Sequence, residues 1–281
     1  MRVLLAAPPS PARLHNLVPL AWALRTAGHD VKIAGQASFV GEILRTGCVA
    51  VDLGTADTES AALAEFADLW RPDVVVSGAQ APVVDAGTVR LLGPLDESGP
   101  ADFDTVPPSL RDSSAARPVR HVPYFGPVVV PEWLRRKPRR SRVLLSLTDA
   151  TLAGPVFDAV AAVDAEVLWA TDAAGIPAGV TMPPNVRLVD TAPPAALLPT
   201  CSALVHDGDA SLALAAATHG VPQLSLTETV IGARIATAGA GYVGSADGIA
   251  ELASLSGAAN ALRDEIAALP APRELVAALT R

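Results

Sequence analysis

Short apolar runs alternate with amphipathic stretches along the first part of the chain. Arg2 to Ala7 is typical of a short buried strand, and Leu14 to Ala27 places apolar residues at helical spacing before Gly28 ends the pattern. The same alternation continues through residues 30–34, 38–45, 49–53, 59–70 and 73–77. Strands that alternate with helices predict βαβ units and therefore a parallel sheet.

Residues 78–125 lose this pattern and are rich in Pro and Gly, which favours loops and short pieces. The alternation restarts at Arg142, and the later elements are expected at 143–147, up to 163, 166–170, 186–189, 195–198, 203–206, 209–219 and 222–226, with helices from 231, 249 and 258. The pattern predicts an N-terminal domain at 1–122, a Pro-rich basic linker at 123–141 and a C-terminal domain at 142–281. We expect an α/β protein of two Rossmann-like parallel-sheet domains facing a cleft that holds the ligand.

The composition narrows the classes of partner. The chain has 281 residues, of which 50% are apolar and 18% charged, so both domains have enough apolar residues for a core. The formal charge of −8 argues against nucleic acid or an anionic membrane as a partner. No stretch approaches the roughly 18 apolar residues of a membrane span, and the first apolar run is too short for a signal peptide. We therefore expect a cytoplasmic protein.

Neither a metal nor a cofactor is indicated. Cys48 and Cys201 lie far apart in the sequence, and the histidines have no metal-ligand spacing. No GxGxxG motif follows the first strand, so nothing there argues for NAD or FAD. The basic run Arg135 to Arg142 is interpreted as a solvated linker in preference to a phosphate or nucleic-acid patch.

Three stretches carry a resemblance to a known family. They are LVPLAWALRTAGHDV at 17–31, the linker segments PPSLR at 107–111 and VRHVPYFGPVVVPEWL at 119–134, and the segment from Leu197 through VHDG at 205–208 to HGVPQL at 219–224. Together they resemble the actinobacterial natural-product glycosyltransferases of the GT-B fold. That resemblance implies transfer of a deoxysugar from a nucleotide carrier to a polyketide-type acceptor.

The position of the family's catalytic base is altered. In that family a His just after the first strand takes the proton from the acceptor hydroxyl, and the matching position here is Arg13. A guanidinium stays protonated at any relevant pH and cannot act as a base. His15 lies two residues further on and is the candidate substitute, although a histidine near a helix N-terminus more often caps or packs.

The donor turn has also changed. In the family, a His-x-Gly turn opens a helix whose free N–H groups hold the pyrophosphate of the donor. Here His206 and Gly208 remain, and Ser211 offers a hydroxyl. Asp209 and Leu212 replace the family's usual small residues and Thr, and Asp207 adds a second carboxylate. A carboxylate about 6 Å from a phosphate costs roughly 3 kcal/mol at an effective dielectric near 20. Because Asp209 is also a favourable N-terminal cap, we expect the chain to cap its own phosphate site.

Further acidic residues are expected in the cleft. The family's sugar-binding Asp-Gln element after Leu224 is missing, with Glu228 or Thr227 as a weak stand-in. Asp149 follows the first strand of the second domain, and Asp85 lies in the shortened loop region. Carboxylates in a partly apolar cleft can have raised pKa values and act as acids or bases. Each is more simply a helix cap or a solvated side chain.

Three hypotheses follow. In the first, a degenerate GT-B protein has lost sugar transfer. It either uses Arg13, His15, Asp207 and Asp209 for cyclisation, isomerisation or dehydration of a polyketide-like ligand, or only binds that ligand. In the second, it is a working glycosyltransferase with His15 as base and Ser211 and His206 at the phosphates. In the third, it is a non-catalytic partner of a pathway enzyme; a homodimer is also compatible with the sequence.

Overall fold

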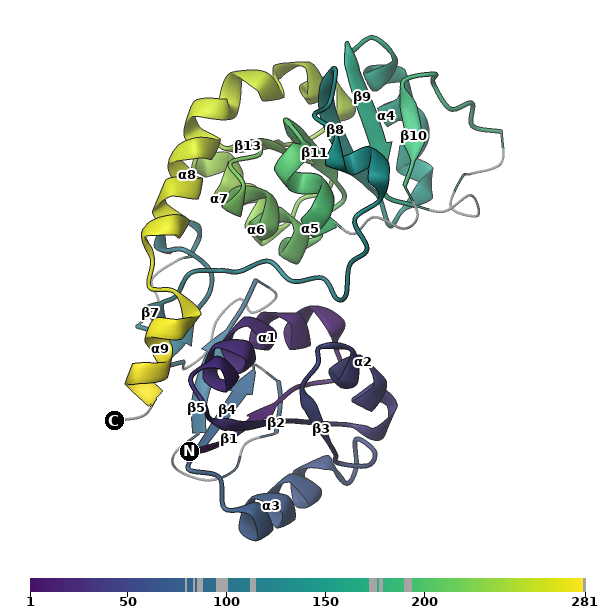
Figure 1. The fold of residues 1–281 in the computed structure, drawn as a ribbon. Coiled ribbons are helices and arrows are strands. Elements are labelled where there is room, and N and C mark those ends of the chain that lie inside the picture. The colour runs from purple at the N-terminus through teal and green to yellow at the C-terminus, as the bar shows by residue number, and fades with distance from the viewer. Residues whose placement is uncertain are drawn as a thin grey trace. The chain divides into compact units, whose positions relative to one another are not determined.

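The structure is a computed structural model that describes residues 1–78, 80–82, 84, 88–94, 101–111, 115–171, 176, 179–189 and 194–279. The chain divides into two compact units, Met1–Pro127 with Ala268–Arg281, and Val128–Ala267. Each unit is built on one parallel sheet (Figure 1). The expected α/β fold with two parallel-sheet domains is confirmed.

The first unit contains a seven-stranded sheet in the order β3-β2-β1-β4-β5-β6-β7, with every pair parallel. Its strands are β1 (Arg2–Ala6), β2 (Asp30–Gly35), β3 (Val49–Asp52), β4 (Val74–Gly78), β5 (Thr88–Leu92), β6 (Phe103–Asp104) and β7 (Arg117–Pro118). The last three lie within 78–125, where the sequence pattern indicated loops and short pieces. Strands of two to five residues between prolines and glycines are too short to show a period.

Helices cover both faces of this sheet. They are α1 (Pro11–Thr26), η1 (Ala37–Phe39), α2 (Val40–Arg45), α3 (Glu59–Trp70), η2 (Pro108–Leu110) and α9 (Pro272–Leu279). Side chains of β1 alternate between the faces, so Val3 and Leu5 pack in a core with α1. Leu4 and Ala6 pack on the other side, in a core with α3.

The second unit contains a six-stranded parallel sheet in the order β10-β9-β8-β11-β12-β13. Its strands are β8 (Ser141–Ser146), β9 (Ala165–Trp169), β10 (Val186–Leu188), β11 (Ala203–His206), β12 (Gln223–Ser225) and β13 (Gly241–Val243). The order along the chain reverses between β8 and β11. In open parallel sheets, this switch point is where a crevice forms at the carboxyl ends of the strands.

The helices of the second unit are η3 (Glu132–Arg135), η4 (Ala150–Leu152), α4 (Ala153–Ala161), α5 (Pro194–Leu197), η6 (Leu198–Thr200), α6 (Ala210–Thr218), α7 (Val230–Thr237), η7 (Ala246–Leu255) and α8 (Ser256–Ala268). Residues of α4 and η7 share one core with Val143 and Leu145 of β8. In α6, every residue from Leu212 to Ala217 is buried. Small alanine side chains allow this helix to lie close to its neighbours.

The C-terminal helix belongs to the first unit, which differs from the expected domain of 142–281. Leu275, Val276 and Leu279 of α9 are part of the core that includes α1 and β1. The backbone N–H of Arg120 donates to the carbonyl of Pro270 at 2.9 Å, which ties the preceding turn to the same unit. The sequence pattern predicted one helical stretch from 258 and did not separate α9 from α8, and it does not indicate which core α9 joins.

The second half of the expected linker packs within the second unit. Leu134 is 6% exposed. The ring of Trp133 faces the guanidinium groups of Arg187 at 4.1 Å and Arg142 at 5.3 Å. Arg142 also pairs with Glu166 at 2.8 Å. Part of the basic run is therefore structural.

Candidate functional site

Most of the predicted donor residues gather at the switch point of the second sheet. β8 and β11 are neighbours, with Ser146 in register with His206. Asp149 follows β8, whereas Asp207, Gly208 and Asp209 follow β11 and lead into α6. This is the edge of the sheet where parallel α/β domains bind ligands.

Asp209 caps α6, as the sequence predicted. Its Oδ1 accepts hydrogen bonds from the backbone N–H groups of Ser211 at 2.9 Å and Leu212 at 3.0 Å. These amides are the donors that a helix N-terminus offers to an anion. The carboxylate is solvent-exposed, so a competing anion can reach it. Ser211 lies in the first turn of α6, and its Oγ is inaccessible to solvent.

His206 is a buried and neutral histidine. It is 1% exposed, and burial lowers its pKa to about 4, against the weaker opposite effects of Asp209 and Asp207. Its Nδ1 accepts a hydrogen bond from the N–H of Gly208 at 3.1 Å, which leaves the proton on Nε2. The imidazole therefore shapes the turn after β11.

Asp207 connects the loops on the two sides of the switch point. Its Oδ2 accepts hydrogen bonds from the N–H of Thr148 at 2.6 Å, the Oγ1 of Thr148 at 2.7 Å and the N–H of Asp149 at 2.8 Å. Asp149 turns its own carboxylate to Thr151, whose hydroxyl and N–H lower the pKa of Asp149. Thr148 was not among the predicted residues, although its place directly after a strand was a usable signal.

The loop after β12 also packs against this turn. The hydroxyl of Thr227 donates to the carbonyl of Asp207 at 2.8 Å. Gly208 has φ +108°, and a Cβ there would lie 2.8 Å from the Oγ1 of Thr227 and 2.7 Å from the Cγ2 of Thr229. Only glycine fits this position. Glu228, the proposed stand-in for the sugar-binding pair, is exposed between these threonines.

Arg13 and His15 lie near the start of α1 in the first unit. The ring of His15 contacts Tyr124 edge to face, with 5.0 Å between centroids, and Tyr124 contacts Trp22 in the same way at 5.1 Å. Burial lowers the pKa of His15, and Glu42 raises it by a smaller amount. The imidazole is therefore neutral at pH 7 and able to accept a proton.

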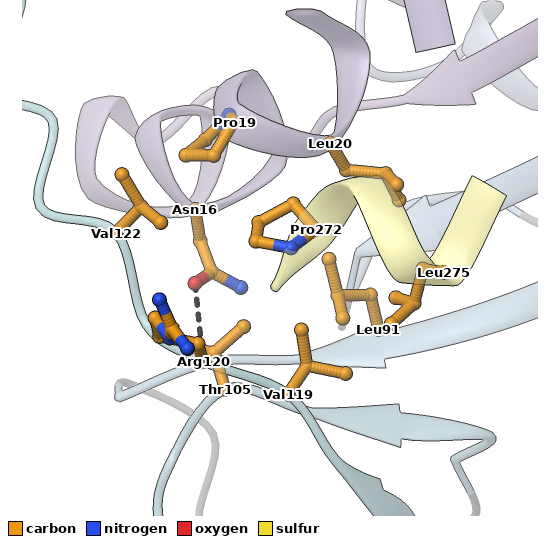
Figure 2. A pocket seen from close by; sticks show the side chains of 10 residues that line it. All are labelled: Asn16, Pro19, Leu20, Leu91, Thr105, Val119, Arg120, Val122, Pro272 and Leu275. Carbon is orange, nitrogen blue, oxygen red and sulfur yellow. Dashed lines mark hydrogen bonds between the residues drawn. The ribbon is translucent and has the colours of Figure 1, made fainter. Parts of the chain in front are cut away.

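A small pocket in the first unit contains none of the predicted site residues (Figure 2). Leu20 of α1, Leu91 of β5 and Leu275 of α9 supply apolar walls. Asn16 faces it, but its amide donates to the carbonyl of Leu92 at 3.1 Å and accepts from Thr105 at 2.8 Å. Because that amide is already bonded on both its nitrogen and its oxygen, we assign this pocket a packing role.

Asp85 lies outside the described residues, so its predicted role stays a prediction. Within the described ranges, no group of three His, Cys, Asp or Glu side chains is placed to hold a metal ion. In the same part of the chain, none of the helices has the length and apolarity that crossing a bilayer requires.

The chain is similar in sequence to one family of known proteins. The family models for the N-terminal and C-terminal domains of "Erythromycin biosynthesis protein CIII-like" proteins match residues 91–148 and 155–281. The "TDP-daunosamine transferase DnrS" of Streptomyces peucetius is 31% identical, over 80% of each chain.

Two solved structures are similar over almost their whole length. The "Spinosyn Forosaminyltransferase SpnP" has a TM-score of 0.89 and 28% identity, over 100% of this chain and 98% of the other. The glycosyltransferase VinC, solved "in complex with DTDP", has a TM-score of 0.88 and 29% identity, over 100% and 99%. The chain therefore belongs to the erythromycin CIII-like family of actinobacterial natural-product glycosyltransferases with the GT-B fold.

Proposed function

We propose that the chain transfers a deoxysugar from a thymidine diphosphate carrier to a hydroxyl group of a polyketide-type aglycone. The observation that carries this proposal is the donor-type turn, His206 to Asp209, opening α6 at the switch point, in a member of a family of sugar transferases. The relatives named above include a TDP-daunosamine transferase and a transferase solved with DTDP. They support the second hypothesis over the loss of sugar transfer and over a non-catalytic partner.

In the proposed reaction, the acceptor hydroxyl oxygen forms a bond to the anomeric carbon of the sugar. The bond from that carbon to the diphosphate oxygen breaks, and the nucleoside diphosphate leaves with the electron pair. The hydroxyl proton passes to the neutral imidazole of His15, because Arg13 at the family's base position cannot accept it.

On the donor side, the diphosphate competes with Asp209 for the amides of Ser211 and Leu212. Gly208 lets Thr227 and Thr229 pack against the turn, and buried His206 fixes the shape of the turn. Donor binding then costs the release of a cap, so we expect it to be weaker than at an uncapped helix.

The test is calorimetric titration with thymidine diphosphate, followed by incubation with a thymidine diphosphate deoxysugar and anthracycline and macrolide aglycones. We expect nucleotide binding, and an aglycone product heavier by one deoxysugar residue. A protein that neither binds the nucleotide nor forms such a product, but converts the aglycone without a donor, would support the acid-base hypothesis instead.

A further inference from the structure

The carboxylate of Asp207 is a hydrogen-bond acceptor for the loop after β8, in addition to carrying a charge beside the donor turn. Both amides after β8, those of Thr148 and Asp149, point at one oxygen of its carboxylate, and the Thr148 hydroxyl is a third donor. The carboxylate therefore bridges the loops after β8 and β11 across the switch point. Three neutral donors at 2.6–2.8 Å hold this carboxylate oxygen in place.

The same residue is held from a third side. Its carbonyl accepts the hydroxyl of Thr227, from the loop after β12, and Thr229 in that loop caps α7 through Gly232. The loops after three adjacent strands are thus joined through one residue. Loops joined in this way lose little further freedom when a ligand binds, and pre-organisation of this kind increases affinity.

We propose that Asp207 is a positioning residue for the sugar-nucleotide donor: it holds the loops after β8 and β11 in the arrangement that binds the diphosphate. This inference rests on the proposed function. It reverses the effect expected from charge alone, under which Asp207 repels the donor. Removing the carboxylate leaves the amides of Thr148 and Asp149 without their partner and frees the β8 loop.

The variants Asp207→Ala, Asp207→Asn and Thr148→Val test this assignment. Alanine removes the acceptor, asparagine keeps an acceptor oxygen without the charge, and valine removes only the hydroxyl donor. Asp247→Asn is the matched control, because Asp247 is exposed in the same unit and its hydrogen bond to Ser245 is local. For each protein, we would measure kcat, KM for the donor, the Kd of thymidine diphosphate, and amide hydrogen exchange at 148 and 149.

We expect Asp207→Ala to raise the donor KM and the nucleotide Kd by about tenfold, or 1.4 kcal/mol, while kcat changes less than threefold. Asp207→Asn should keep part of the affinity that Asp207→Ala loses. Amide hydrogen exchange at 148 and 149 should accelerate more in the alanine variant than in any other. A merely structural role would not produce this separation of KM from kcat.

Tighter nucleotide binding by Asp207→Asn, or an unchanged donor KM in Asp207→Ala, would overturn the assignment and restore the repulsion hypothesis. If the wild-type protein binds no nucleotide, the proposed function fails and Asp207 has no donor to position. Unchanged exchange at 148 and 149 in Asp207→Ala would separately show that the carboxylate does not hold the loop.

Discussion

The amides of Ser211 and Leu212 have two competing partners, the carboxylate of Asp209 that caps α6 and the diphosphate of the donor. Removing the carboxylate separates its effect on stability from its effect on nucleotide binding. Asp209→Ala should lower the free energy of unfolding by about 1 kcal/mol, the usual cost of a lost cap. It should also tighten thymidine diphosphate binding by about fivefold or more, because an adjacent negative charge is removed.

Asp209→Asn gives the complementary result for this prediction. The amide oxygen still caps α6, so stability should change by only a few tenths of a kcal/mol, while nucleotide affinity rises. Urea unfolding and calorimetry measure the two quantities, with Asp247→Asn as the charge-matched control. Weaker nucleotide binding in both Asp209 variants would show that this carboxylate assists the donor.

His15 is the residue on which the proposed proton transfer depends. His15→Ala should lower kcat by about a hundredfold or more, within the range for loss of a general base. In the wild type, kcat/KM should fall only below pH 6.5, because burial lowers the pKa of this imidazole. Tyr124→Phe keeps the ring that contacts His15 and is the packing control. Equal losses in the two variants would assign His15 to packing.

At the scale of elements, the sequence pattern predicted most of the parallel strands and helices of the two units, because buried runs and amphipathic helices alternate there. It missed β5 to β7 and β13, because strands of two to five residues are too short to show a period. It also predicted the cap by Asp209, which depends on local spacing. The bond from Asp207 to Thr148 joins residues 59 positions apart, which no local pattern reveals.

The placement of α9 gives a prediction at this scale. Leu275 is 4% exposed in the core of the first unit. Leu275→Ala should therefore destabilise that unit by about 2–4 kcal/mol, as for other buried leucines. Leu69, which is 81% exposed on α3, gives the control Leu69→Ala. Hydrogen exchange of β1 amides would report the loss, and faster exchange confined to the second unit would contradict the assignment of α9.

At the scale of the whole molecule, each unit buries one histidine that resists protonation. Burial lowers the pKa of His121 in the first unit and of His206 in the second to about 4. In the unfolded chain these two imidazoles take up protons below pH 6.5, whereas in the folded units they stay neutral until about pH 4. Stability should therefore fall on acidification through this window, by about 1.4 kcal/mol per pH unit for each histidine.

The variant His121→Leu isolates this effect in the first unit, because the Nδ1 of His121 is buried and has no hydrogen-bond partner among the described residues. Between pH 7.5 and pH 5, we expect the variant to lose about 2 kcal/mol less stability than the wild type. His29→Ala, at a partly exposed position, should keep the wild-type difference. Exchange of β1 amides at both pH values measures the first unit by itself. An equal loss in His121→Leu and wild type would mean that His121 is already protonated in the folded unit at pH 5, and that its burial is compensated by a partner charge.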